Sequence, residues 1–170
     1  MKRAELHIEF LSTIRDTVYR LALSLVGDCA EAEDITQDIC ERVWRARDAI
    51  LDSRYPRAYV CRMTHNMAID RLRAKLRLVE LGDEGFRRID SCDGEQVVEL
   101  GDVAELTRRA IASLPDKQQM TIYMRDVEGY DIEEIAEAME CDEASVRMNL
   151  SRARKAVREK LLKIMNYGVR

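Results

Sequence analysis

Hydrophobic positions in the first 80 residues repeat at the spacing of an α-helix. Over residues 5–26, apolar side chains recur every three or four positions, as 3.6 residues per turn requires, and form a stripe of Ile8, Leu11, Ile14, Val18, Leu21 and Leu25. A second stripe covers about 28–48 and comprises Ala32, Ile35, Ile39, Val43 and Ala46. A third helix is predicted over about 56–79 and carries Tyr59, Met63, Met67 and Leu72. Helices of this length can bury a modest core together, so a three-helix bundle is predicted.

Residues with special backbone preferences separate these helices. Gly27 can adopt the left-handed conformation that ends a helix, and the Asp28 carboxylate can accept hydrogen bonds from the N–H groups that open the next one. Pro56 suits the first turn of the third helix, because the N–H that proline lacks has no helical acceptor there. The helix boundaries are therefore predicted from chemistry as well as from spacing.

The pattern changes over residues 81–102, where helical spacing disappears and glycines and acids accumulate. This composition is typical of an extended, flexible connection. After it, helical spacing returns in shorter segments, at about 103–113, 116–127, 132–139 and 143–165. The predicted fold is all-α, with a helical bundle over 1–80 and a second helical domain over 103–170, joined by an acidic flexible linker.

Composition narrows the fold class and the compartment. Only 7 glycines and 2 prolines occur in 170 residues, too few for the many turns of a β-sandwich or barrel. No apolar run approaches the ~20 residues that span a bilayer, and the charged N-terminus lacks the apolar core of a signal peptide. We therefore expect a cytoplasmic protein without membrane insertion.

The cysteines and histidines do not indicate metal or cofactor chemistry. The 5 cysteines are odd in number and form no CxxC pair, and His7 and His65 stand far apart. These features favour neither a disulfide framework nor a zinc site, so we expect buried or incidental thiols, no metal and no cofactor. The sequence also lacks a phosphate-binding loop and any catalytic set with suggestive spacing, and no enzymatic activity is predicted.

The net charge of −4 would disfavour nucleic-acid binding if it were spread evenly along the chain. It is concentrated in the middle instead, where residues 81–106 hold 2 basic and 8 acidic side chains. Residues 1–80 hold 14 basic and 13 acidic side chains, and residues 107–170 hold 12 and 11. Each predicted domain is therefore close to neutral, and the acidity belongs to the linker.

Within each domain the charges are segregated along the chain. Asp28–Glu41 contains six acids and no base, whereas Arg54–Arg77 contains seven bases and one acid. In the second domain, Asp126–Glu143 contains nine acids and no base, and Arg147–Lys163 contains seven bases and one acid. Each domain is thus predicted to have a basic helix suited to phosphates and an acidic segment suited to another partner. Charged faces can also be merely solvated, so charge alone leaves both interpretations open.

The end of the chain has the pattern of a helix-turn-helix. Residues 131–139 predict a short amphipathic helix, in which Asp131 and Glu134 match a capping box. A tight turn at 140–142, without the glycine often found there, leads to a long basic helix with the predicted inward face Val146, Leu150, Ala153 and Val157. In this motif the second helix enters the major groove of DNA. Because the basic residues are confined to that helix, DNA binding is favoured over an ordinary helical hairpin.

These segments together resemble one family, the bacterial extracytoplasmic-function (ECF) sigma factors. The resemblance to region four lies in Leu114–Gln119, Arg125–Tyr130, Glu134–Ala136 and Ser145–Lys155. The resemblance to region two lies in Ala32–Asp38, Val43–Trp44, Tyr55–Tyr59 and Asn66–Arg71. It implies a fold of two helical domains and a function in promoter-specific transcription initiation. It also implies core RNA polymerase and promoter DNA as partners, and an anti-sigma factor that holds the protein inactive.

The resemblance further implies roles for individual residues. Polymerase binding would fall to Asp34, Gln37, Asp38, Glu41 and Arg42. Recognition and melting of the −10 element would involve Arg54, Tyr55, Arg57, Tyr59, Arg62, His65, Asn66, Arg71, Arg73 and Lys75. The −35 element would be contacted by Ser145, Arg147, Met148, Ser151, Arg152, Arg154 and Lys155. The linker would thread a basic channel of the polymerase with Asp90, Asp93, Glu95 and Glu99.

Several alternatives stay open from the residues alone. Trp44 is more typical of a core position than of a binding hot spot, and Tyr59 can either pack in the bundle or hold a base. A conventional transcription regulator would explain the helix-turn-helix, but it leaves the acidic second helix and the basic third helix without a role. Dimeric operator binding without polymerase would favour that regulator.

Overall fold

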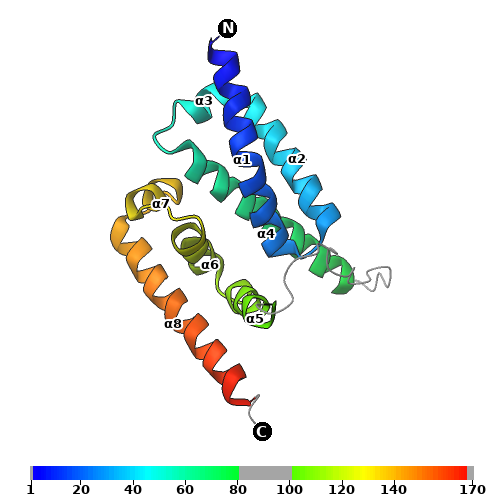
Figure 1. Cartoon of the computed structure of the whole chain (residues 1–170), viewed down its shortest axis with the longest axis vertical. Helices are drawn as coiled ribbons and strands as arrows, with labels where there is room; N and C mark the ends of the chain where they lie inside the picture. The colour runs from blue at the N-terminus through cyan, green and yellow to red at the C-terminus, as the bar shows by residue number, and fades with distance from the viewer. Residues whose placement is uncertain (1, 81–100, 168–170) are drawn as a thin grey trace. The chain divides into compact units, whose positions relative to one another are not determined.

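The computed structural model describes residues 2–80 and 101–167, and every secondary-structure element within these ranges is a helix (Figure 1). The chain divides into two compact units, Met1–Asp93 and Gly94–Arg170. The all-α prediction is confirmed. The predicted linker lies outside the described residues except for its last two positions, and so do the four acids expected to thread the polymerase. Among the described helices, none is both long enough and apolar enough to cross a bilayer.

The first unit is a bundle of long helices with one short helix added. α1 (Lys2–Val26) packs against α2 (Cys29–Arg45) and α4 (Pro56–Glu80), and α2 also packs against α4. The short α3 (Arg47–Leu51) connects α2 to α4. Buried side chains from all of these helices form the core, namely Ile14, Val18, Ala22, Ala32, Ile35, Ile39, Val43, Ile50, Val60, Met67 and Ala68. The predicted bundle is confirmed, and α3 is a helix that the spacing did not indicate.

The ends of these helices follow the predicted chemistry. Gly27 has φ +69° and donates its N–H to the Leu23 carbonyl at 2.9 Å, which closes α1 in the left-handed conformation that glycine adopts without strain. The Asp28 carboxylate accepts the Glu31 N–H at 2.8 Å and opens α2. α4 begins at Pro56, as predicted.

Two apolar side chains of the predicted helices, Ile8 in α1 and Tyr59 in α4, lie outside the buried core. His7 is 6% exposed, whereas Ile8 is 61% exposed. Positions 7, 11, 14 and 18 are separated by four, three and four residues, so they lie on the same side of the helix. His7 therefore belongs to the buried row, and the prediction for Ile8 is wrong. In α4, Tyr59 is 42% exposed and its neighbour Val60 occupies the core instead. The interpretation of Tyr59 as a packed residue is therefore excluded.

Trp44 lies on the surface at the end of α2, with 42% of its area exposed, so the expectation of a core position is wrong. The Arg47 guanidinium stands 4.9 Å from the centre of its ring, a cation–π distance. The His7 ring meets it edge-on at 6.5 Å. α2 ends at Arg45, three residues before the predicted end, and Ala46, which was expected on the inward face, is exposed.

The second unit consists, in chain order, of α5 (Gly101–Ala112), α6 (Asp116–Ile122), the π-helical turn η1 (Tyr123–Val127), α7 (Ile132–Ala138) and α8 (Glu143–Tyr167). α8 packs against α5, α6 and α7. Their shared core comprises Ala110, Leu114, Ile122, Leu150, Ala153 and Val157. The predicted inward face of the last helix is confirmed, since Val146 is also buried. The helix predicted over 116–127 widens after Ile122, where the Glu128 N–H donates to the Tyr123 carbonyl five residues back at 3.1 Å.

The described cysteines are not all thiols. Cys40, Cys61 and Cys141 carry thiols, but Cys29, the first residue of α2, is bonded in a disulfide. The expectation of thiols is therefore wrong at Cys29. Over residues 2–80 and 101–167, no three His, Cys, Asp or Glu side chains gather in a way that could hold a metal ion.

Candidate polymerase and nucleic-acid interfaces

One face of α2 carries the residues expected to meet the polymerase. Positions 34, 37, 38, 41 and 42 follow the i, i+3, i+4, i+7, i+8 spacing that places side chains on one side of a helix. Asp34, Gln37, Glu41 and Arg42 are exposed, and Asp38 is half-buried. Glu41 forms an ion pair with Arg45 one turn further on. The structure thus brings the predicted set together on a mainly acidic surface.

A shallow groove between α1 and α2 extends this surface. It is lined by Arg15, Asp16, Tyr19, Glu33, Thr36, Gln37 and Cys40. Burial raises the pKa of the Cys40 thiol, and the nearby Arg15 cation offsets part of that rise. The thiol therefore stays protonated at neutral pH and acts as a small apolar side chain.

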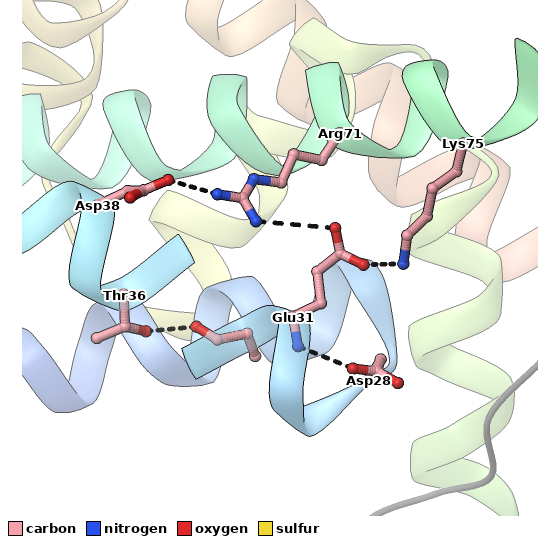
Figure 2. A network of polar contacts seen from close by, with 7 residues as sticks. Asp28, Glu31, Thr36, Asp38, Arg71 and Lys75 are labelled. Atoms are coloured by element: carbon pink, nitrogen blue, oxygen red, sulfur yellow. Dashed lines mark hydrogen bonds and ion pairs between the residues drawn. The ribbon is translucent and has the colours of Figure 1, made fainter. Parts of the chain in front are cut away.

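Ion pairs tie α2 to the basic helix α4 (Figure 2). The Arg71 guanidinium pairs with the Asp38 carboxylate, and its other terminal nitrogen lies 3.9 Å from Glu31 Oε1. The second Glu31 oxygen pairs with the Lys75 ammonium. Glu31 is only 15% exposed, so the network is better shielded from water than an ordinary surface pair. Asp28 accepts the Glu31 N–H and fixes the start of α2 beside the network.

This network joins residues that were predicted to bind different partners. Asp38 was expected to meet the polymerase, whereas Arg71 and Lys75 were expected to meet DNA phosphates. A cation paired with a shielded carboxylate has less free charge to offer a phosphate. The structure therefore gives Arg71 and Lys75 a role inside the unit, where they hold α4 against α2.

The other candidates of the −10 interface differ in exposure. Half-buried positions are Tyr55 and Arg62, and exposed positions are Arg54, Arg57, Tyr59, Asn66 and Arg73. The Arg54 guanidinium stands 5.2 Å from the centre of the Tyr55 ring. His65 is 2% exposed, and the structure corrects its prediction, because a ring enclosed in the bundle is not presented to a base. His65 lies four residues after the buried Cys61 and three before the buried Ala68, so helical spacing places it on the buried side of α4.

The helix-turn-helix formed by α7 and α8 is held by local hydrogen bonds at the start of each helix. Asp131 and Glu134 form the predicted capping box, with the Asp131 N–H donating to Glu134 Oε2 at 2.7 Å. Glu140 has φ +52°, so it takes the left-handed conformation that glycine supplies in many such turns. Asp142 Oδ1 accepts the Ser145 N–H at 2.6 Å. This hydrogen bond, joined by a second one from the Ser145 side chain, lowers the pKa of the Asp142 carboxyl.

The residues expected to contact the −35 element line α8 outside its buried row. Ser145 is half-buried at the start of the helix, and the exposed candidates are Arg147, Met148, Ser151, Arg152, Arg154 and Lys155. Arg147 is 62% exposed and pairs with Glu143 at 2.6 Å. Lys155 is 79% exposed and lies 4.0 Å from Glu159. Exposed pairs one turn apart are weak, so both cations remain accessible to a phosphate or a base.

An acid outside the predicted set reaches α8 from the π-helical turn. Arg154 Nε and Nη2 donate to Asp126 Oδ2 and Oδ1 at 3.0 and 2.5 Å. The hydrogen bond to Asp126 raises the pKa of the Arg154 guanidinium. The two residues are 28 positions apart and lie on different elements, η1 and α8, so no local pattern in the sequence indicates that they meet. Among the predicted −35 residues, Arg154 is the one whose side chain forms a described ion pair with a different secondary-structure element.

Comparison with known proteins decides the family. The family model for sigma-70 region 2 matches residues 10–78, and the model for sigma-70 region 4 matches residues 104–157. The ECF sigma factor SigL of Mycobacterium tuberculosis is 30% identical over 155 residues, which cover 89% of this chain and 85% of that protein. The chain belongs to the ECF sigma factors. Directing RNA polymerase to specific promoters at initiation is the function of this family and of this sigma factor.

Other relatives of this sigma factor agree with that result. SigW of Bacillus subtilis is 26% identical over 163 residues, covering 90% of this chain and 87% of that protein. SigE of Mycolicibacterium smegmatis is 30% identical over 151 residues, covering 87% of this chain but 58% of the relative. The sigma factor RpoE of Bartonella quintana, solved with the anti-sigma factor NepR, shares the fold with a TM-score of 0.70 at 23% identity, over 90% of this chain and 94% of that chain.

Proposed function

We propose that this sigma factor binds core RNA polymerase through α2, engages the −10 element through α4 and reads the −35 element through α8. The observation that carries the proposal is the placement of opposite charges on neighbouring helices. Six acids fall within Asp28–Glu41 and seven bases within Arg54–Arg77, on two helices that pack together. A protein that bound only DNA would not need an exposed acidic face, so this face supports a second partner with a basic surface.

The polymerase surface that fits α2 is a basic one. Asp34, Gln37 and Glu41 present two carboxylates and an amide to solvent on one face. Complementary charge speeds association and fixes the register of docking more than it adds affinity. Asp38 and Arg42 extend the same face, and Asp38 can keep its pair with Arg71 while its other oxygen meets the polymerase.

The proposed −10 surface of α4 combines phosphate and base contacts. Arg54, Arg57, Arg62 and Arg73 supply positive charge for the displaced strand. Tyr59 is 42% exposed and offers a ring on which an unstacked base can rest, and Tyr55 and Asn66 are further candidates for base contacts. Arg71 and Lys75 contribute mainly by orienting α4, and His65 contributes as a packed residue of the core.

The proposed −35 surface is the N-terminal half of α8. Ser145, Arg147, Met148 and Ser151 are placed to meet base edges in the major groove, as the recognition helix of a helix-turn-helix does. Arg152 and Lys155 are suited to phosphates. A base-reading side chain gives sequence preference, whereas a phosphate contact strengthens binding to all sequences alike.

Three further features complete the proposal. The protein supplies specificity and has no catalysis of its own, because polymerisation belongs to the core enzyme. Its work on core RNA polymerase and promoter DNA takes place in the cytoplasm. An anti-sigma factor is a proposed partner, supported by the complex in which the Bartonella quintana relative was solved.

Run-off transcription from a randomised promoter library tests the main proposal. The full-length chain is mixed with sigma-free core polymerase, and the transcripts are sequenced. We expect specific starts with enriched −10 and −35 motifs that vanish when the chain is omitted. Absence of transcripts together with polymerase-independent binding to duplex DNA would support a conventional regulator instead.

The anti-sigma proposal has its own test. The tagged chain is recovered from its source cells, and bound proteins are identified by mass spectrometry. We expect a stoichiometric partner that suppresses run-off transcription when it is added back to the holoenzyme. A recovered partner without that effect, or recovery of core polymerase alone, would contradict the proposal.

A further inference from the structure

The contact between η1 and α8 fixes an angle as well as a distance. Asp126 uses both carboxylate oxygens, one for Arg154 Nε at 3.0 Å and one for Nη2 at 2.5 Å. Such a paired arrangement holds the plane of the guanidinium against the plane of the carboxylate. The buried row of α8 already limits rotation of the helix, and the paired contact at the surface adds a second restraint on its orientation.

Arg154 lies at a position from which its contact with Asp126 can affect the direction of Arg147. It lies seven residues after Arg147, and seven residues complete almost two turns, so both side chains leave α8 along nearly the same line. This line runs beside the buried row that contains Leu150 and Val157. A small rotation of α8 at Arg154 would therefore shift the direction of Arg147 by the same angle.

The turn that presents Asp126 is itself anchored on both sides. The neighbouring Arg125 donates from Nη1 to the Tyr130 carbonyl at 2.7 Å and to Asp131 Oδ1 at 3.0 Å. The Tyr123 hydroxyl bonds Glu128 Oε1 at 3.1 Å. Asp131 is also the N-cap of α7. The hydrogen bonds of Arg125 therefore connect the turn that holds Asp126 to the first helix of the helix-turn-helix.

We infer that Asp126 is a positioning residue for −35 recognition, which acts through Arg154 by setting the rotation of α8. Arg154 then serves the orientation of the helix and does not act as a phosphate contact. The inference rests on the proposed function, because it concerns the surface assigned there to the −35 element. It adds a residue outside the recognition helix that determines how well the helix reads sequence.

Three variants in the randomised-promoter assay separate positioning from phosphate binding. Asp126→Asn removes the charge that holds Arg154, Arg154→Met removes the cation, and Arg154→Lys keeps a cation without the paired geometry. We expect all three to reduce −35 enrichment by about tenfold, the order of one good base contact, while −10 enrichment stays as in the wild type. Glu137→Gln, which removes one exposed acid of α7, is the charge-matched control and should leave both motifs unchanged.

A phosphate role for Arg154 would give a different pattern. Asp126→Asn would then strengthen binding to matched and scrambled −35 duplexes alike, Arg154→Met would weaken both, and Arg154→Lys would behave as the wild type. That pattern would overturn the inference, as would an unchanged −35 motif in Asp126→Asn. Circular dichroism at the assay temperature checks folding, since a purely stabilising role would lower the melting temperature without changing −35 preference in the folded variants. Absence of any enriched motif with the wild-type chain would instead overturn the proposed function.

Discussion

The cations of the two basic helices differ in exposure and in the position of their acidic partners. The helices are α4 in the first unit and α8 in the second. Arg71 and Lys75 on α4 are 30% and 26% exposed and pair with acids of the neighbouring α2. Arg147 and Lys155 on α8 are 62% and 79% exposed and pair with acids of their own helix. The sequence places seven bases in each segment, so equal numbers of basic residues do not produce equally available positive surfaces.

The difference follows from what lies beside each helix. α4 packs against α2, and α2 carries the acidic run of its unit. In the second unit the acidic run occupies η1, α7 and the turn, and Asp126 is the member that crosses to α8. We therefore expect the −10 surface to depend on an internal electrostatic balance, and the −35 surface to depend on the orientation of one helix.

The largest expected effect tests whether the two units are energetically separate. Leu150→Ala removes most of a buried side chain from the second core and should lower the free energy of unfolding of that unit by about 3 kcal/mol. Trp44 is the only tryptophan, so its fluorescence reports the first unit, whereas far-UV circular dichroism reports both. Relative to the wild type, we expect a lower urea midpoint for the part of the dichroism signal that comes from the second unit. The urea midpoint measured by fluorescence should not change. An equal shift in both signals would mean that the units unfold together.

A smaller effect tests the internal balance in the first unit. Glu31→Gln removes the acid shared by Arg71 and Lys75 and should tighten polymerase-free binding to a single-stranded oligonucleotide by about tenfold at low salt. Glu33→Gln is the matched control on the same helix and should have little effect. Glu143→Gln releases the exposed Arg147 on α8 and should change affinity by less than about twofold. Equal gains from Glu31→Gln and Glu143→Gln, measured by fluorescence anisotropy, would remove the distinction between the two helices.

A stabilising change is expected at the turn before α8. Glu140 has φ +52°. This left-handed conformation is unfavourable for any residue that carries a Cβ atom, whereas glycine adopts it at little cost in free energy. Glu140→Gly should raise the free energy of unfolding of the second unit by about 0.5–1 kcal/mol, measured by urea titration. Glu137→Gly, in the interior of α7, is the control and should be destabilising. A loss of stability in Glu140→Gly would show that the Glu140 side chain has a role that its backbone conformation does not reveal.

The smallest effect concerns pH at the start of α8. The pKa of Asp142 is lowered in the folded protein by hydrogen bonds from Ser145, so its carboxylate stabilises the fold above the unfolded-state pKa of about 4. This contribution is lost as the pH falls through the lower folded pKa. Asp142→Asn keeps an acceptor for the cap but does not titrate. The melting temperature of the wild type should exceed that of Asp142→Asn by a constant margin near neutral pH, and the margin should vanish in acid. A margin that does not shrink as the pH falls below about 4 would contradict the assignment.

Local signals in the sequence were sufficient to predict every described helix except the short α3, and most of the helix ends. Gly27, Asp28 and Pro56 act through backbone groups a few residues away, and the capping box at Asp131 does the same. The buried row of α8 was also predicted, because its spacing is regular and its members are apolar. In α1 the prediction failed where the buried row contains the polar His7, because the apolar Ile8 beside it fits the same spacing. In α4 both Tyr59 and Val60 are apolar, so composition alone could not show which of the two is buried.

The sequence by itself determined an all-α chain with an acidic second helix, a basic third helix and a basic recognition helix. Only the tertiary structure decided which charges are engaged and which are offered to a partner. Asp38 and Arg71 are 33 positions apart, and Asp126 and Arg154 are 28 apart. Whether such residues meet depends on how two helices cross and on the extra residue in the π-helical turn, which changes the direction of every side chain after it. Periodicity fixes the face of a helix to which a side chain belongs, but the opposing residue is set by packing between distant segments.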